Sequence, residues 1–392
     1  HDSCAGISSS RGVGESIMSA AQWRRAMNTQ APRVQVNVVT QRPAPTTVSS
    51  PSRSWHPNDA ALVEPQGFRS AWSHIRFRHV VVLLGLLIYP LVASPFFVYQ
   101  IAAQAMALGL IALSLTFLGG YGGMVSLSQM TVAGVSGYLI AIFGTSSMTT
   151  ISLGWPWWLA VVLSVIIAMV FATLVGWLSI RTEGIHTIMI TLAIGVAFFY
   201  LTHQNYALFN GFQGFSKIAA PTVGDVDFKE PEAFYFLSVG CALIAYWAVK
   251  YLVRSPFGFA LQGIRDNPRR MNALGFNVTA HRLAAHAFAG LIASVGGILL
   301  IWYNNRISPG SVNTGALINI LVIAVLGGMK HPIGAFIGAI AFVLLQNFAI
   351  DLVDRQRFNL VIGGVFLLIV FFSPDGLLGL WQSFRSRWIN PS

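Results

Sequence analysis

The stretch WWLAVVLSVIIAMVFATLVGWLSI (Trp157–Ile180) contains no charged side chain and no proline. An α-helix rises about 1.5 Å per residue, so this run is long enough to cross the roughly 30 Å hydrocarbon core of a bilayer. A helix also satisfies its own backbone hydrogen bonds, which lipid cannot do for it. The stretch is therefore predicted to be a transmembrane helix.

Similar apolar runs lie on both sides of it. They are Val80–Val98, Ile101–Leu118, Ser126–Phe143, Ile185–Thr202, Ala233–Val253, Leu283–Tyr303, Ala316–Leu326, Ile333–Leu352 and Phe358–Phe372. Ala316–Leu326 is short and is predicted to be a half-span or part of a broken helix. Only 9% of the residues are charged, against about 25% in soluble domains. We expect an all-α polytopic membrane protein with about eight to ten transmembrane helices.

The chain divides into two regions by composition. Residues 1–70 are rich in Ser, Pro, Thr and Arg and have no apolar periodicity, so they are predicted to form a disordered cytoplasmic tail. Residues 71–392 hold the apolar runs and form the predicted transmembrane domain. The loop 254–282 interrupts this domain with polar and basic residues.

Lys and Arg are distributed unevenly between the loops. If the N-terminus lies inside and each run crosses once, thirteen fall on the inner side and five on the outer side. The inner set is Arg69, Arg76, Arg78, Arg181, Lys250, Arg254, Arg265, Arg269, Arg270, Arg282, Lys330, Arg385 and Arg387, and the outer set is Lys217, Lys229, Arg306, Arg355 and Arg357. Such an excess marks cytoplasmic loops, so both termini and the loop 254–282 are predicted to be cytoplasmic. The basic charge suits anionic lipid or an acidic partner, and no basic folded domain for nucleic acid is present.

Several kinds of membrane machinery are excluded by what the sequence lacks. A phosphate-binding P-loop needs Gly-Lys-Ser/Thr, and none of the four lysines follows a glycine. A proton relay needs acids within the spans, yet no Asp or Glu lies between Glu64 and Glu183. Cys4 lies in the tail and Cys241 in a span, and no HExxH occurs, so no disulfide, metal site or cofactor is predicted. A Na⁺ site built from carbonyls and hydroxyls is compatible with the sequence.

The loop RSPFGFALQGIRDNPRRMNALGFNVTAHR (Arg254–Arg282) carries helix punctuation. Its first part predicts a short amphipathic helix that Arg265 and Asp266 end. Asn267-Pro268 is a favoured helix start, and Gly275 suits the left-handed position past a helix end. A helix this short needs support, which a bilayer surface or a cytoplasmic partner can give; the residues leave both alternatives open.

Six motifs occur in the order found in a known family. They are GYGGMVSLSQ (Gly120–Gln129), SPFGFALQGIRDNPRRMNALGFNV (Ser255–Val278), ASVGG (Ala293–Gly297), ISP (Ile307–Pro309), GGMKHPIGAFIGA (Gly327–Ala339) and SPDGLLGL (Ser373–Leu380). Together they resemble the branched-chain amino acid permease family, the membrane subunits of ABC importers, and its longer, LivM-like branch. The resemblance implies a type II-like importer permease in a bacterial inner membrane, with no enzymatic activity of its own.

The resemblance also implies partners. It implies a second, LivH-like permease, two cytosolic ATP-binding subunits and an external solute-binding protein, for which the outer loop Gln204–Glu232 is a candidate contact. The loop 254–282 would then be the coupling element. Its predicted contact residues are Pro268, Arg269, Arg270, Met271, Leu274 and Gly275.

The segment Gly119–Gln129 is the candidate for the solute pathway. Its glycines break a helix and leave free N–H groups at the next helix start, which can face a carboxylate without any Arg. The candidates are Tyr121, Ser126, Ser128 and Gln129, with Asn319 in a later span. The alternative is a plain cytoplasmic turn with polar helix packing, and Asn319 can equally join helices.

Small residues predict close helix packing, whether static or hinged. They are Ala289, Ala293 and Gly296 in one span and the GxxxG pair Gly334 and Gly338 in another. The first functional hypothesis is an ABC importer permease for branched-chain amino acids, or for urea or a short amide. A stand-alone Na⁺-coupled carrier or channel is the competing class.

Overall fold

The computed structural model describes residues 96–352, except 149, 183, 219, 224 and 225, and a few isolated positions outside that range. Grouping by contacts divides the chain into His1–Trp72 and Ser73–Ser392, and the described residues all lie in the second unit. The predicted tail and most of the predicted spans Val80–Val98 and Phe358–Phe372 lie outside the described residues.

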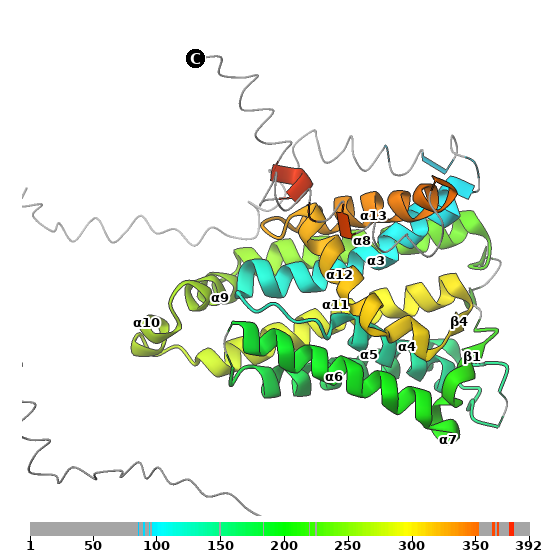
Figure 1. Cartoon of the computed structure of the whole chain (residues 1–392), viewed down its shortest axis with the longest axis horizontal. Coiled ribbons are helices and arrows are strands. Elements are labelled where there is room, and N and C mark those ends of the chain that lie inside the picture. The colour runs from blue at the N-terminus through cyan, green and yellow to red at the C-terminus, as the bar shows by residue number, and fades with distance from the viewer. Residues whose placement is uncertain are drawn as a thin grey trace, which may run out of the picture. The chain divides into compact units, whose positions relative to one another are not determined.

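The described part is built from helices (Figure 1). They are η3 (Phe97–Ala103), α3 (Gln104–Thr116), η4 (Phe117–Tyr121), α4 (Gln129–Phe143), α5 (Trp157–Ser179), α6 (Ile185–Gln204), α7 (Tyr206–Phe209), η5 (Gly211–Gln213), α8 (Pro231–Arg254), α9 (Pro256–Asp266), α10 (Pro268–Ala273), α11 (Val278–Asn304), η6 (Pro309–Val312), α12 (Thr314–Gly327) and α13 (Pro332–Leu352). Short strands are β1 (Phe215–Ser216), β2 (Thr222–Val223), β3 (Val226–Asp227) and β4 (Arg306–Ile307).

Five continuous helices in this part are long and apolar enough to cross a membrane. They are Phe97–Tyr121, α5, α6, α8 and α11, and a sixth span is reached if the bent pair α12–α13 counts as one. The chain is therefore an all-α polytopic membrane protein, as predicted. The higher total of eight to ten stays a prediction, because two of its runs fall outside the described residues.

Two predicted spans differ from the helices that form. The predicted run Ser126–Phe143 becomes a helix only from Gln129. The chain leaves helical geometry before it, at Gly123, which takes a φ of 67°. The short run Ala316–Leu326 is confirmed as part of a broken helix, since α12 and α13 are bent by 116° at their junction. Gly328 takes a φ of 100° there, and Pro332 starts the next helix.

Helix α11 is the centre of the packing. Figure 1 shows α3, α8 and α13 on one side of it and α4, α5 and α6 on the other. Ala289 and Ala293 are fully buried on α11, and a side chain at Gly296 would meet Ile111 and Leu110 of α3. Small residues thus let the central helix approach its neighbours closely.

The helices α12 and α13 are joined by glycine contacts. A Cβ built on Gly334 would meet the carbonyl oxygens of Gly327 and Gly328, and one built on Gly338 would meet that of Ile323. The backbones are therefore in direct contact. Any larger residue at these two positions requires the bent pair to separate.

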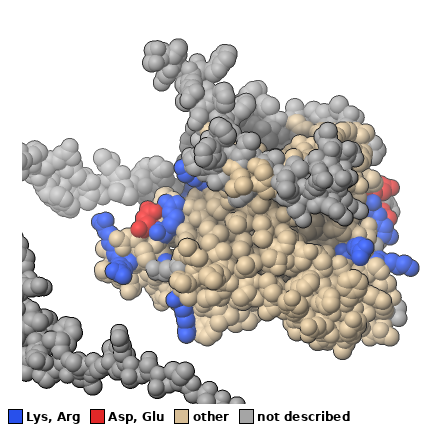
Figure 2. Space-filling view, in the orientation of Figure 1, with Lys and Arg blue, Asp and Glu red and all other residues tan. Residues whose placement is uncertain are grey.

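The two ends of the described part differ in character. Helices α9 and α10 lie at one end, and α7 with the strands β1 and β4 at the other (Figure 1). The strands β1 and β4 pair antiparallel, Phe215 opposite Ile307 and Ser216 opposite Arg306, and β2 pairs with β3. Figure 2 shows Lys and Arg gathered at the two ends of the visible face, with an uncharged surface between them. Lipid-spanning proteins have this distribution.

Candidate functional site

A break in the helix after α3 brings polar backbone into the packed interior. The helix turns to η4, and Gly123 then takes a φ of 67°, a conformation that other residues rarely adopt. Non-helical chain leads inward to Ser128, and α4 begins at Gln129, whose side chain is buried. The start of α4 is thus surrounded by protein.

Seven buried polar side chains belong to this break and to the helices beside it, and we call them the buried polar cluster. They are Ser114, Thr116, Ser126, Ser128, Gln129, Thr131 and Thr191, each at most 1% exposed. They come from α3, α4, α6 and the chain between α3 and α4. None is charged, so the cluster offers hydrogen-bonding groups in the interior without burying a charged side chain of the protein.

Hydrogen bonds join part of the cluster. The Ser126 and Ser128 hydroxyl oxygens are 2.8 Å apart, and Ser114 Oγ donates to Gln129 Oε1 at 3.1 Å. The backbone N–H of Leu127 donates to Thr191 Oγ1 at 3.1 Å, which ties the broken segment to α6. Three of the residues predicted as a pathway, Ser126, Ser128 and Gln129, therefore lie in this buried region, and Ser114 and Thr191 contact it.

Other groups of the cluster have no hydrogen-bond partner among the residues that the structure describes. Thr116 Oγ1 and Thr131 Oγ1 are buried without a hydrogen bond, and the Ser128 side chain makes no cap bond to the first turn of α4. The first N–H groups of a helix lack intrahelical acceptors and carry partial positive charge. The start of α4 therefore offers donors to an anionic or polar group.

Two predicted pathway residues lie elsewhere. Tyr121 ends η4, and its hydroxyl donates to the Lys330 carbonyl oxygen at 3.4 Å, so it contacts the α12–α13 junction. Asn319 is partly exposed on α12, and no described hydrogen bond joins it to the cluster. Sequence reasoning missed Ser114, Thr116, Thr131 and Thr191; the hydroxyl side chains within the apolar runs were the available signal.

The loop 254–282 forms α9 and α10, and α10 begins with the Asn267 cap that the sequence predicts. Ser255 Oγ accepts from the Gly258 N–H at 3.3 Å, and Asn267 Oδ1 accepts from the Arg270 N–H at 3.0 Å. Gly275 takes a φ of 90° after α10. The loop is therefore a folded element and not an extended connection.

The two loop helices differ in how they are held. Leu261 and Ile264 of α9 are completely buried, so α9 packs against the spans. Helix α10 buries no residue: Arg269 and Arg270 are exposed, and Leu274 after it is 66% exposed. Met271 faces α9, because a Cβ on Gly263 would lie 2.9 Å from its sulfur. Leu274 is thus an exposed apolar side chain next to α10, and Pro268 is half-buried.

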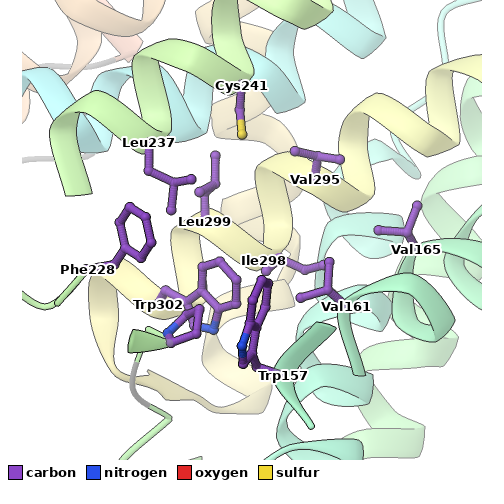
Figure 3. Close-up of a pocket in the computed structure, with 11 residues that line it drawn as sticks. Trp157, Val161, Val165, Phe228, Leu237, Cys241, Val295, Ile298, Leu299 and Trp302 are labelled. Atoms are coloured by element: carbon purple, nitrogen blue, oxygen red, sulfur yellow. The ribbon is translucent and has the colours of Figure 1, made fainter. Parts of the chain in front are cut away.

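An apolar cavity of about 390 Å³ lies away from both sites. Figure 3 shows its side chains converging from α5, α8 and α11, with Trp157 and Trp302 near one end and Cys241 near the other. The lining contains no charged side chain, hydroxyl or amide. A charged solute would lose its hydration there without compensation, so this cavity does not suit one.

The residues that the structure describes form no metal-binding site. No three His, Cys, Asp or Glu side chains come together there to hold an ion. The described ion pair Arg265–Asp266 lies at the surface, with the two side chains 39% and 67% exposed. The buried polar cluster and the exposed α10 are therefore the two features with functional geometry.

Comparison with known proteins gives one family match. The model of the family described as branched-chain amino acid transport system / permease component matches residues 97–371. The LivM high-affinity branched-chain amino acid transport system permease protein of Salmonella typhimurium is 23% identical over 76% of this chain and 74% of its own length.

Two further relatives have names that differ from LivM in the solute or in the permease type. The nucleoside ABC transporter permease protein NupC of Lactococcus lactis is 24% identical over 64% of this chain and 82% of its own length. The probable branched-chain amino acid transport permease protein LivH of Methanocaldococcus jannaschii is 26% identical over 57% and 67% of the two lengths. No solved structure matches the chain.

Proposed function

The chain belongs to the family of permease components of branched-chain amino acid transport systems, and from that premise we propose that it is the membrane subunit of an ABC importer for branched-chain amino acids. The observation that supports this most is the buried start of α4, where no side chain of Ser128 caps the first N–H groups and the Thr131 hydroxyl has no hydrogen-bond partner in the described part of the chain. Such a site is prepared for a small solute that carries a carboxylate.

The carboxylate would bind at the positive end of α4. Backbone donors and hydroxyls can neutralise it without an Arg, and hydrogen bonds to a charged acceptor are stronger than neutral ones. Apolar residues of the surrounding spans would contact the branched side chain of the solute. Because the cluster is fully buried here, the solute enters only after the helices around it move apart.

Energy for that movement comes from partners in this proposal. The sequence has no Walker lysine, so ATP is hydrolysed on two cytosolic subunits that contact α10. Arg269, Arg270, Leu274 and Gly275 are exposed there, and a short helix with few contacts of its own can follow a partner. A second permease of the LivH type and an external solute-binding protein complete the importer. The end that carries α9 and α10 faces the cytoplasm.

Nucleosides are the second candidate solute. The relative NupC is a nucleoside permease by name, and ribose hydroxyls can pair with serine and threonine. A nucleoside has no carboxylate for the start of α4, whereas an amino acid does, so the amino acid fits this site better. Urea and short amides also lack a carboxylate.

Uptake by the purified importer in liposomes tests the proposal. We expect ATP-dependent accumulation of labelled leucine, isoleucine or valine, and little accumulation of adenosine or urea. The control is the same chain reconstituted alone, with a Na⁺ gradient and no ATP. Uptake by the chain alone would favour the carrier alternative, and ATP-driven uptake of adenosine alone would move the assignment to nucleosides.

A further inference from the structure

One side chain of the coupling loop contacts the segment that leads to the buried polar cluster. Arg265, the penultimate residue of α9, donates from Nη1 to the carbonyl oxygen of Gly120 at 2.7 Å. Gly120 lies in η4, three residues before Gly123, where the helix breaks. The bond spans 145 residues of sequence and directly connects the loop to the helix break.

The orientation of this guanidinium is fixed from within the loop. Its Nε donates to Asp266 Oδ1 at 3.0 Å, and its Nη2 lies 2.9 Å from the same oxygen. An ion pair this exposed contributes little to stability. Arg has a planar fork that can hold two partners at once, which Lys lacks. With Nε and Nη2 held by Asp266, Nη1 is directed towards the carbonyl oxygen of Gly120.

The stem of Arg265 also lies against the broken segment. A Cβ built on Gly123 would be 2.5 Å from Arg265 Cγ, and Gly123 has a φ of 67°. Both the conformation and the contact require glycine at this position. Arg265 thus touches the segment twice, once through a hydrogen bond before the turn and once through packing in it.

The exposed helix α10 reaches Arg265 through α9. Met271 of α10 packs on Gly263, two residues before Arg265. A displacement of α10 is therefore delivered to the last turn of α9. Arg265 also lines a polar cavity of about 210 Å³ together with Gly123, Met124 and Val125, so its side chain has space to change position.

We propose that Arg265 is the positioning residue that transmits movement of α10 to the segment Gly120–Gln129. In the conformation described, its bond holds the segment so that the cluster is closed. Movement of α10 draws Arg265 from Gly120, and the segment then opens the buried polar cluster. This inference rests on the proposed coupling of α10 to ATPase subunits.

The test uses the complete importer in liposomes with Arg265→Lys and Arg265→Gln. Both should still hydrolyse ATP at the basal rate, while solute-stimulated hydrolysis and solute moved per ATP fall about tenfold, as expected for loss of one charge-assisted bond. Asp266→Asn should give a smaller loss, since Nη1 can still reach Gly120. Arg181→Gln removes the same charge at the same end from a side chain with a described cation–π contact to the Trp177 ring, and should behave as wild type.

A second readout separates transmission from a structural role. Val125→Cys, in a chain without its native cysteines, should be labelled by a thiol reagent at a rate that changes with ATP. In the Arg265→Lys background the complex should assemble, yet the labelling rate should no longer respond. An unchanged response, or wild-type transport per ATP, would overturn the role of Arg265. Absence of ATP-driven transport in the wild type would instead overturn the proposed function.

Discussion

Thr131 has a hydroxyl that the fold leaves without a hydrogen bond, although the side chain is completely buried. An unpaired buried hydroxyl costs about 1–3 kcal/mol, so a purely structural site would favour valine. Thr131→Val should therefore leave the melting temperature unchanged or raise it. If the hydroxyl binds solute, KM should rise about tenfold, equivalent to about 1.4 kcal/mol.

Thermal unfolding and uptake kinetics on the same preparation check this. Thr173→Val is the matched control, because Thr173 Oγ1 donates to the Met169 carbonyl oxygen within its own helix at 2.7 Å. It should leave KM unchanged. A Thr131→Val importer with wild-type KM would remove Thr131 from the solute pathway.

Ser126 and Gln129 test the cluster as a whole. The double change Ser126→Ala with Gln129→Ala removes the hydroxyl that pairs with Ser128 and the amide that accepts from Ser114. We expect kcat/KM for uptake to fall at least about tenfold, because both groups lie at the start of α4. Ser164→Ala is the control, since Ser164 is equally buried but lies in α5. Normal transport by the double variant would mean that this break is only a packing feature.

At the scale of elements, the turn after α10 depends on Gly275. No atom lies within 4 Å of a Cβ built there, and its φ is 90°, so only backbone strain opposes substitution. Left-handed geometry costs other residues roughly 1–2 kcal/mol, and Asn less than the β-branched Val. Gly275→Val should lower uptake and solute-stimulated ATP hydrolysis, and Gly275→Asn should retain most of both.

Gly240→Val is the matched control for this turn. A Cβ on Gly240 also meets nothing within 4 Å, but the residue lies in the middle of α8 with ordinary helical geometry. Its transport should stay near wild type. Equal activity of Gly275→Val and wild type would show that the turn has no part in coupling.

For the whole molecule, the distribution of basic loops predicts which side of the membrane each end of the described part faces. Leu274→Cys, beside α10, should react with a membrane-impermeant thiol reagent only from the cytoplasmic side. Gln213→Cys, at the opposite end and exposed, should react only from outside. Labelling of intact cells and of inverted vesicles, after removal of Cys4 and Cys241, distinguishes these arrangements. Reversed labelling would place the coupling loop outside and contradict the ATPase contact.

Features that depend on local sequence were predictable, and features that depend on packing were not. The spans α5, α6, α8 and α11 follow from uninterrupted apolar runs, and the caps of α10 from Asn267-Pro268 and Gly275. The cluster was not predicted because its hydroxyls come from separate helices, Thr131 from α4 and Thr191 from α6, and their arrangement depends on how those helices pack. The sequence indicates only that Arg265 lies at a helix end. Its contact with Gly120 was not predictable, because the two residues are 145 positions apart in the chain.

Co-purification from the native membrane, followed by mass identification of the bound proteins, tests the central claim most directly. The chain should be recovered with two ATP-binding subunits and a second permease, without overexpression of any partner. Leu274→Glu, which places a charge on the exposed apolar contact, should lose the ATP-binding subunits and keep the second permease. A chain recovered alone that still moved solute in liposomes without ATP would contradict the account.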